Sequence, residues 1–495
     1  MTTSESDAQS GQVEAESPEK KVPPVQRIIR MLLNGGAEFF HATDGHPFVS
    51  LSINGHPETL WIGLPEFRDW LARLFYCEVN AVPSSSTLNQ AISVLTGIAK
   101  FASPQRSIFV RVGGYHENVY VDLANEGRQA VEINSDGWRI ISDPPVKFRR
   151  PRGMLELPQP LTNGSLNPLR ALLNIGNDDQ WVLVVSWLLA ALRPSGPYPI
   201  LVLEGSHGSA KSTATRLLRH IIDPNAAPSR SGPENIRDLM ISAFNGWCQT
   251  FDNLSHIPAW LSDAFCRLAT GGGFATRELY SNEAERLFEA TRPVLMNGID
   301  VNITRGDLLD RTLMLSLPTI APTERLTESR FWRRAEEIRP VVLGGLFTAM
   351  SGALRRMHEV RLAELPRMAD FAIWVTAAES TLGWDEGTML AAYNRNRRTS
   401  SELALEASPL VPVLENLVDQ GPWAGTATEL FSKLSEMTSY VAVTTRGWPG
   451  NPRDLSASLR RLAPNLRDAG IDVQFDKTSG SRSRKTISLS KLRAE

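Results

Sequence analysis

The pattern of hydrophobic and polar positions divides the chain into segments of different character. Residues 1–23 are polar, contain several Glu and Ser and have no aromatic side chain, which predicts a disordered leader. Beyond them, apolar runs predict strands over 48–53 and 60–62 and a helix over 65–76, and a hairpin is expected from 107–112 with 119–123. This mixture predicts an N-terminal α+β domain over 24–160, in which no residue carries a recognisable chemistry.

After a helix with bulky apolar residues over 178–192, a short apolar strand leads into a loop of small residues that opens into a second helix. The loop, Gly-Ser-His-Gly-Ser-Ala-Lys-Ser-Thr, is close to the P-loop pattern G-x-x-x-x-G-K-[ST]. Backbone N–H groups at such a helix start bind phosphate, Lys211 would reach the β- and γ-phosphates, and the Ser212 hydroxyl would bind Mg²⁺. Ala210 replaces the last glycine, and we expect it at the helix entrance with a negative φ, where a methyl group fits. The residues predicted to bind ATP are Gly205, Ser206, His207, Gly208, Ser209, Ala210, Lys211, Ser212 and Thr213.

Two later apolar strands bring polar groups to the same region. Asp252 follows the apolar run 247–251 and is the expected carboxylate on the metal side. Asn297 ends the strand predicted over 292–297, where an amide can orient the attacking water or sense the γ-phosphate. The alternative for Asn297 is a turn residue before Gly298.

Together these blocks resemble the superfamily 3 helicases, the AAA+ ring motors of small DNA viruses, poxvirus primase-helicases and mobile elements. The resemblance rests on the P-loop, on Phe-Asp-Asn at 251–253 with the apolar helix after it, on the stretch 271–288, and on the strand that ends at Asn297. In that family the third block forms a hairpin that enters the ring channel and grips the DNA backbone, which assigns Arg277 and Arg286 to DNA. The chain also resembles ATP-binding proteins of prophages and integrative elements.

The resemblance also implies that a neighbouring subunit offers an arginine to the γ-phosphate. Arg311, just before an expected edge strand, is the matching residue, and the alternative is a surface salt bridge with Asp307 or Asp310. Arg367, on a later helical segment, is a candidate lid residue.

The second block departs from the family at its second acid. Superfamily 3 enzymes usually carry one acid on the metal side and one that acts on water, and here the second position is Asn253. An amide can orient water but cannot accept its proton, so either hydrolysis is slow or another carboxylate serves, for which Glu204 and Asp263 are candidates. A slow switch gated by ATP therefore remains an alternative to a motor.

Residues 321–405 read as a helical lid or linker, and 406–495 have the element order of a winged helix. Helices are expected over 412–418, from 426 and over 454–462, followed by strands over 471–475 and 486–489.

One apolar face of the third of these helices contains Leu455, Leu459, Leu462 and Leu466. That face leaves the arginines outside, Arg467 among them, and Pro464 should kink or end the helix. A basic helix beside a basic hairpin favours contact with DNA phosphates over a merely solvated face or a protein partner. The residues assigned to DNA are Arg453, Arg460, Arg461, Lys477, Arg482, Arg484 and Lys485.

Composition adds a few limits. A net charge of −2 over 495 residues gives no global basic field, so nucleic acid must be bound by local patches. Cys77, Cys248 and Cys266 lack metal spacing and are expected to be buried thiols. No apolar run reaches membrane-spanning length and no signal sequence is evident, which predicts a cytoplasmic protein.

The overall expectation is a multidomain α/β protein with a central P-loop AAA+ ATPase domain over 161–320. The first hypothesis for its function is an ATP-driven DNA helicase or translocase in phage or mobile-element replication, a hexameric ring that uses ATP and Mg²⁺ and acts on single-stranded or forked DNA. The alternative is an ATP-switched DNA-binding regulator or loader without unwinding. A nucleotide kinase fits less well because no acceptor pocket is visible, and residues 1–160 lack the acid cluster of a primase.

Overall fold

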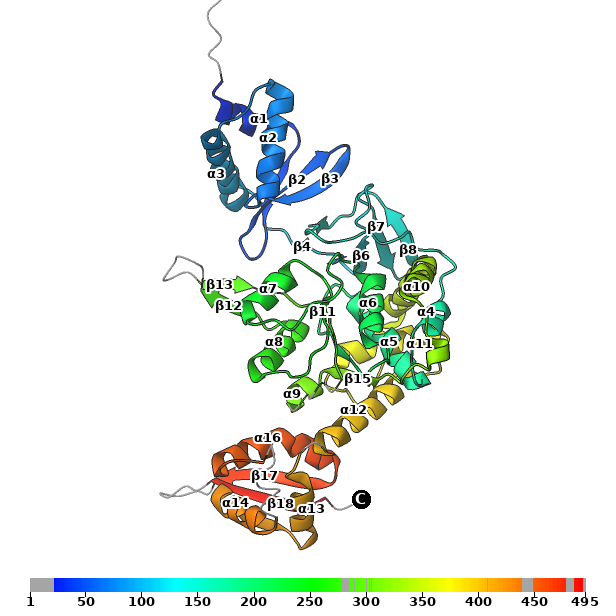
Figure 1. Ribbon diagram of the computed structural model, residues 1–495. Coiled ribbons are helices and arrows are strands. Elements are labelled where there is room, and N and C mark those ends of the chain that lie inside the picture. Colours follow the sequence, from blue (N-terminus) through cyan, green and yellow to red (C-terminus); the bar gives the residue numbers. More distant parts are fainter. Residues whose placement is uncertain are drawn as a thin grey trace, which may run out of the picture. The chain divides into compact units, whose positions relative to one another are not determined.

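The computed structural model describes residues 22–277, 285–288, 290–299, 301, 303, 305–406, 408–438, 448–477 and 485–492. The chain forms two compact units, residues 1–106 and residues 107–495 (Figure 1). The predicted leader lies outside the described residues except for its last two positions, and the first helix begins at Pro24.

The first unit packs three helices with a three-stranded antiparallel sheet. Its elements are α1 Pro24–Asn34, β1 Glu38–His41, β2 Pro47–Ile53, β3 His56–Trp61, α2 Pro65–Val79 and α3 Ser85–Phe101. Phe67 and Leu71 of α2 and Leu95 of α3 are fully buried in its core. The strands and the helix predicted from the alternation of apolar residues in this segment are confirmed.

The second unit begins with a four-stranded antiparallel sheet. Its strands are β5 Val112–Tyr115, β6 Asn118–Asp122, β7 Ala130–Asn134 and β8 Gly137–Ile141, and beside it β4 Ile108–Phe109 pairs in parallel with β9 Lys147–Phe148. The predicted hairpin is therefore displaced, because the chain turns at Arg111, whose φ is +65°, and the first arm of the hairpin starts only at Val112.

This sheet corrects the predicted domain boundary at residue 160. Val121 and Ile133 belong to the same core as α5 Asp178–Ala191 and α10 Glu328–Arg356, and the Trp138 indole donates to Thr348 Oγ1 at 3.1 Å. The helix that covers the sheet thus comes from far along the chain, and a local pattern of apolar residues cannot indicate this.

The central sheet of the second unit has four parallel strands in the order β11-β14-β10-β15. Its strands are β10 Ile200–Glu204, β11 Gln249–Phe251, β14 Val294–Asn297 and β15 Thr312–Ser316. Its helices and short connections are α4 Asn167–Leu172, α6 Lys211–Ile222, α7 Ile236–Phe244, α8 Ala259–Thr270 and α9 Gly306–Leu309, with a 3-10 turn over Pro322–Glu324. An antiparallel pair, β12 Phe274–Arg277 and β13 Glu285–Phe288, stands between β11 and β14 in the chain, where the sequence predicts a hairpin. The carboxyl ends of β10, β11 and β14 share one edge of the sheet.

Helix α10 is crossed closely by the segment 161–165. Pro340 stands inside this 29-residue helix, and its carbonyl accepts the N–H of Leu161 at 3.0 Å. A Cβ on Gly344 would lie 1.8 Å from the Leu161 carbonyl oxygen, so only glycine permits this approach. The helix is followed by α11 Ala369–Leu382 and α12 Thr388–Glu406.

The C-terminal region has helices and strands in the predicted order. They are α13 Val411–Asp419, β16 Trp423–Gly425, α14 Ala427–Glu436, α16 Pro452–Asp468, β17 Ile471–Lys477 and β18 Lys485–Lys491, with the strands arranged β16-β18-β17. Leu455, Leu459 and Leu466 are buried, as expected. Helix α16 does not end at Pro464, because buried leucines on both sides of it offset the loss of one backbone hydrogen bond, and the kink expected as the other possibility stays a prediction.

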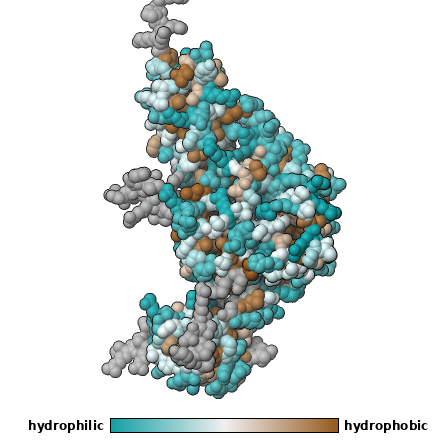
Figure 2. All heavy atoms as spheres, viewed as in Figure 1, coloured by the Kyte–Doolittle hydropathy of each residue, from teal (hydrophilic) through white to brown (hydrophobic). Residues whose placement is uncertain are grey.

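On the face of the molecule seen in Figure 2, hydrophobic residues are scattered among hydrophilic ones.

The three cysteines differ in exposure. Cys248 and Cys266 are buried as expected, whereas Cys77 is exposed, so the expectation for that thiol is wrong. Within the described residues, no helix combines the length and the apolar character needed to cross a membrane.

Candidate nucleotide-binding site

The P-loop connects β10 to α6 through three left-handed backbone positions. Gly205 has φ +147°, Gly208 has φ +83° and Ala210 has φ +61°. The predicted negative φ at Ala210 is therefore wrong. The chain turns into α6 at this position through a left-handed residue, a conformation that costs an alanine about 1 kcal/mol and that the usual glycine adopts freely.

The Lys211 side chain lies across this loop. Its Nζ donates to the carbonyl oxygens of Gly205 at 2.6 Å and Ser206 at 2.8 Å. Burial lowers the pKa of Lys211, and the charge of Asp252 opposes that change. The ammonium group thus already occupies the place where a P-loop lysine meets phosphate oxygens.

The two predicted metal ligands meet at the carboxyl edge of the sheet. The Ser212 hydroxyl donates to Oδ1 of Asp252 at 2.8 Å. A hydroxyl and a carboxylate so close together suit Mg²⁺, which proteins bind through one or two carboxylates plus the phosphates of a substrate. Across the described residues, no group of three or more His, Cys, Asp or Glu could hold a metal by itself.

Asn297 is buried and connects this edge to the P-loop helix. Its Nδ2 donates to Thr215 Oγ1 at 2.8 Å, and its Oδ1 accepts the backbone N–H of Asn253 at 3.1 Å. Asn253 itself has φ +57° and an exposed side chain. Because Asn adopts left-handed backbone more readily than Glu does, the backbone alone gives one reason for an amide at this position. The role of Asn297 toward water or the γ-phosphate stays a prediction.

The two other candidate bases lie in different surroundings. Glu204 ends β10 directly before the P-loop, and its Oε1 accepts the N–H of Val301 at 3.1 Å. Asp263 lies on α8, where its carboxylate pairs with Arg305 at 2.6 Å. Glu204 is thus adjacent to the P-loop, whereas Asp263 is committed to an ion pair on another element.

Arg311 lies at the opposite edge of the sheet, before β15. Its guanidinium donates to the backbone carbonyl of Asp307 at 2.6 Å and to the Asp307 carboxylate, so the salt-bridge alternative describes its contacts within one chain. Thr312 pairs with Ile200 at the start of β10, which separates Arg311 from its own P-loop by roughly 20 Å along the strands. Arg311 is therefore remote from the P-loop of its own chain, and its role toward the nucleotide of a neighbouring subunit stays a prediction.

Arg367 belongs to the same charged group. It pairs with Asp307 at 2.6 Å and with Asp310 at 2.8 Å, and Arg397 also approaches Asp310, at 3.6 Å. The expectation that Arg367 serves as a lid over the nucleotide of its own chain is wrong, because these acids hold it at the amino edge of the sheet.

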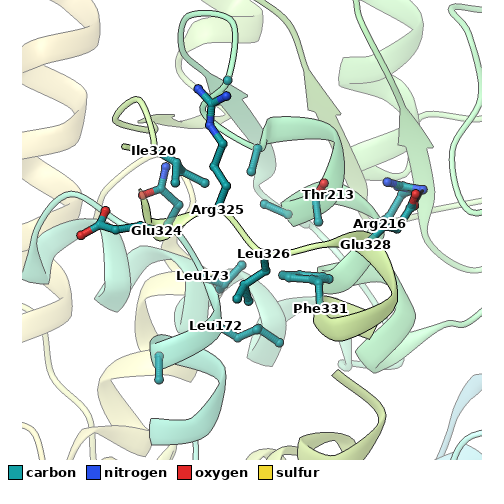
Figure 3. Close-up of a pocket in the computed structure, with 15 residues that line it drawn as sticks. Leu172, Leu173, Thr213, Arg216, Ile320, Glu324, Arg325, Leu326, Glu328 and Phe331 are labelled. Atoms are coloured by element: carbon teal, nitrogen blue, oxygen red, sulfur yellow. Dashed lines mark hydrogen bonds and ion pairs between the residues drawn. The ribbon is translucent and has the colours of Figure 1, made fainter. Parts of the chain in front are cut away.

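A cavity of about 540 Å³ lies beside the P-loop, and sequence reasoning missed it (Figure 3). Its apolar wall comes from Leu172 and Leu173 before α5 and from Leu326 and Phe331 near the start of α10. The size and the mixed lining are those of small-ligand sites in general. Its walls come from three segments far apart in the sequence, so no single stretch of sequence signals it.

Gly208, Ala210 and Thr213 of the P-loop and its helix place one end of this cavity at the P-loop. Asn174 Nδ2 donates to the carbonyls of Ser209 at 3.1 Å and Pro318 at 2.5 Å. A cavity with an apolar wall at one end and phosphate-binding backbone at the other has the character of a nucleoside phosphate site.

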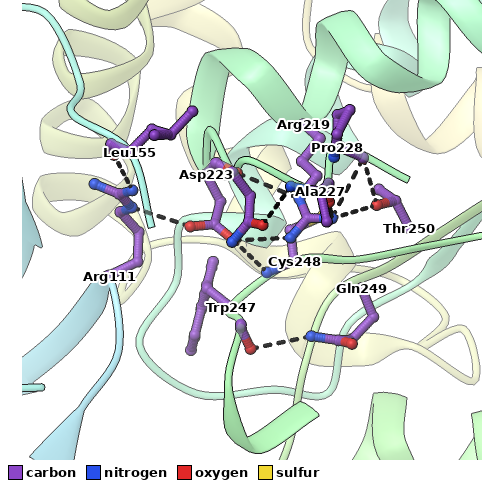
Figure 4. Close-up of polar contacts among 12 residues, drawn as sticks. Arg111, Leu155, Arg219, Asp223, Ala227, Pro228, Trp247, Cys248, Gln249 and Thr250 are labelled. Atoms are coloured by element: carbon purple, nitrogen blue, oxygen red, sulfur yellow. Dashed lines mark hydrogen bonds and ion pairs between the residues drawn. The ribbon is translucent and has the colours of Figure 1, made fainter. Parts of the chain in front are cut away.

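Behind the P-loop, a buried polar network joins three elements (Figure 4). Asp223, which caps the end of α6, accepts from Arg111 Nε at 3.1 Å and from the backbone N–H of Cys248 at 3.0 Å. Arg219 of α6 donates to Thr250 Oγ1 at 2.7 Å. Burial lowers the pKa of Arg111 and the charge of Asp223 opposes this, as expected for a buried ion pair. The network fixes the P-loop helix to β11 and to the entry of the four-stranded sheet.

The residues assigned to DNA are described only in part. Arg453, Arg460, Arg461 and Arg467 are exposed on α16, as expected; Arg460 stacks over Phe475 at 4.0 Å, and Arg467 pairs with Asp472 at 3.0 Å. Lys485 is exposed at the start of β18. Arg277, Arg286 and Lys477 lie on strands β12, β13 and β17, but their side chains are outside the description, and Arg482 and Arg484 lie outside the described residues.

Comparison with known families gives two matches along the chain. The family model described as actinomycete integrative conjugative element replication protein matches residues 166–415, and the one described as the AICE RepA C-terminal domain matches residues 407–495. The curated proteins gave no match. Among solved structures, the A form apo structure of the NrS-1 C-terminal region is similar with a TM-score of 0.42 and 11% identity, covering 96% of this chain and 100% of that chain. A second A form apo structure of that region has a TM-score of 0.38 and 10% identity, covering 93% and 98%.

Proposed function

Because this chain belongs to the family of actinomycete integrative conjugative element replication proteins, we propose that it is the ATP-driven DNA helicase or translocase of such an element. In this proposal it is an AAA+ ATPase of the superfamily 3 type that works as a hexameric ring. The element's own replication is the setting that the family gives, and the ATPase supplies the motion along DNA.

The contact between Ser212 and Asp252 at 2.8 Å, beside Lys211, carries this proposal. The backbone of the P-loop and Lys211 would hold the phosphates of ATP, and Ser212 and Asp252 would hold Mg²⁺. The bound Mg²⁺-ATP supplies the phosphoryl group whose transfer to water releases the free energy for motion. The cavity lined by Leu172, Leu173 and Phe331 would receive the nucleoside.

The arrangement of the remaining elements supports a motor. The pair β12–β13 precedes β14, which is the position of the DNA-gripping hairpin that the resemblance implies. Arg311 lies too far from its own P-loop to act there, as expected of an arginine that serves a neighbouring subunit. Among the described C-terminal residues, the order of helices α13, α14 and α16 and the three-stranded sheet supports a winged helix with exposed arginines for DNA phosphates.

A second candidate rests on Asn253. An ATP-switched DNA-binding regulator or loader needs nucleotide binding but not rapid hydrolysis, and an amide in place of the second acid fits that requirement. The left-handed backbone of Asn253 makes substitution by Glu a strained test, so turnover of the wild-type protein decides better between the two candidates.

The test is ATP turnover with and without single-stranded DNA, together with unwinding of a forked duplex. Wild-type protein is compared with Lys211→Ala and with Lys100→Ala, an exposed lysine of α3 that serves as the matched control. We expect hydrolysis stimulated by DNA, and unwinding, in the wild type and the control, and loss of both in Lys211→Ala. Tight ATP binding with negligible turnover and no unwinding would favour the switch, and no nucleotide binding at all would overturn both candidates.

A further inference from the structure

Arg325 lies beside the P-loop with its guanidinium uncommitted. It follows the 3-10 turn over Pro322–Glu324, and its Nη2 is 3.3 Å from the position that a Cβ on Gly208 would occupy. Figure 3 shows its side chain extending away from Leu172 and Phe331 of the apolar wall. Its side chain is exposed, and within the described part of the chain no hydrogen bond or ion pair of this side chain is found.

The other arginine of the cavity is already paired. Arg216 contacts Glu328 at 3.2 Å and lies 5.5 Å from the centre of the Trp332 ring. Its charge is therefore compensated before any ligand arrives, whereas that of Arg325 is not. The lining of the cavity thus contains two guanidinium groups, and only one of them lies next to the loop that binds phosphate.

The segment that carries Arg325 is hydrogen-bonded to the P-loop. Ile320 N donates to the Gly208 carbonyl at 3.2 Å, and the hydroxyls of Ser206 and Thr319 are 2.7 Å apart. These contacts fix the segment before Arg325 against the loop, so a ligand would have to order the Arg325 side chain but not its segment.

We propose that Arg325 binds the phosphate chain of the nucleotide held by its own subunit. This inference rests on the proposed nucleotide binding and adds a binding residue that the P-loop pattern does not contain. A guanidinium presents a planar fork of N–H donors that matches two phosphate oxygens, so it suits the outer face of a phosphate chain better than a single ammonium does. Since Gly208 lies in the middle of the loop, Arg325 meets phosphates that ATP and ADP share.

The experiment measures the affinities of ATP, ADP and adenosine for the full chain by calorimetry. The variants are Arg325→Gln, Arg325→Lys and, as the matched control, Arg333→Gln, an exposed arginine of α10 that does not line the cavity. We expect Arg325→Gln to weaken both ATP and ADP by about tenfold and to leave adenosine unchanged, because one charge-assisted phosphate contact is lost. Arg325→Lys should recover part of the loss, since it keeps the charge but not the fork.

Two results would overturn this inference. Equal ATP and ADP affinities in wild type and Arg325→Gln would show that the guanidinium does not meet the phosphates. An equal loss for adenosine would place its contact at the nucleoside instead. Lys211→Ala separates this failure from failure of the proposed function: if the wild type binds ATP, Lys211→Ala does not, and Arg325→Gln binds normally, only the role of Arg325 is lost.

Discussion

The two edges of the central sheet differ in whether their charged side chains are already paired within the chain. At the carboxyl edge, Lys211 donates to carbonyls of the P-loop and Ser212 donates to Asp252, and the charges and lone pairs of these groups can be offered to a ligand. At the amino edge, Arg311 and Arg367 are bound to Asp307 and Asp310 of the same chain. Deeper at that edge, Arg111 is buried against Asp223.

In the proposed assembly, the carboxyl edge binds the ligand and the amino edge couples one subunit to the next. The carboxyl edge can be completed by a small molecule, because Lys211 lies across the P-loop and the pair of Ser212 and Asp252 has no salt bridge to a basic residue within the described part of the chain. At the amino edge the acids are already paired with arginines of the same chain, so Arg311 can serve a neighbouring nucleotide only in an assembly that brings the two edges of different subunits together. An isolated subunit should therefore bind nucleotide well and hydrolyse it poorly.

The largest expected effect is at Arg311. Arg311→Ala should lower ATP turnover by about 10³-fold, as for an arginine that completes a site in trans, and leave ATP affinity unchanged. Steady-state turnover and equilibrium binding check this, with Arg333→Ala, an exposed arginine of α10, as the control. ATP turnover by Arg311→Ala equal to that of the wild type would contradict a role of the amino edge in hydrolysis.

The buried pair at the amino edge should matter for stability. Arg111→Met leaves the buried Asp223 carboxylate with only the more distant Arg219, at 3.9 Å, which should lower the free energy of unfolding by about 3 kcal/mol. Denaturant unfolding checks this. In the double variant Arg111→Met with Asp223→Leu, most of the loss should be recovered, and an equal loss in single and double variants would contradict an ion-pair role.

Asp252 tests whether the carboxyl edge binds the metal. Asp252→Asn removes one negative charge from the site and should raise the Mg²⁺ concentration needed for half-maximal turnover by about 10- to 100-fold. A magnesium titration of turnover measures this, with Asp419→Asn, an exposed acid of α13, as the control. An unchanged magnesium requirement would place the metal elsewhere.

Ala210 tests strain at the same edge. Ala210→Gly restores the common P-loop residue and relieves a left-handed alanine, at the cost of a more flexible unfolded chain. We expect thermal unfolding to give a gain of no more than about 1 kcal/mol in stability. A loss of stability would mean that the loop makes use of the methyl group.

The smallest effect concerns the pH dependence at Asp307. Burial alone would raise its pKa, but the hydrogen bond and charge of Arg311 and the charge of Arg367 outweigh burial and hold the pKa below its ordinary 3.8. The carboxylate therefore adds stability at pH values above 3.8, and this contribution is lost as the pH falls through the folded-state pKa. The stability difference between wild type and Asp307→Asn should be below about 1 kcal/mol near neutral pH and disappear on acidification. A difference that grew toward low pH would contradict this sign.

The residues that meet at the carboxyl edge could be picked out from the sequence, because they lie in a short motif or at the ends of apolar strands. Lys211 and Ser212 are adjacent, and Asp252 and Asn297 each end an apolar strand. The amino edge was harder, since Arg111 and Asp223 lie far apart in the chain and neither belongs to a motif. Arg325 and Phe331 were missed for the same reason, because the cavity they line exists only once three distant segments have folded together. The left-handed φ of Ala210 was not predicted, because the conformation of the loop determines it and the residue type does not.

The pairing of Arg111 with Asp223 also bears on how this protein can be cut into fragments. The family match begins at residue 166, whereas the compact unit begins at residue 107. A fragment that starts at the family boundary would keep every group of the P-loop, yet it would remove Arg111 from Asp223 and uncover the face of α10 that lies under β7 and β8. The part of the chain that the family model matches is thus shorter than the part that folds as one unit, and a minimal folded fragment should be sought from residue 107 onward.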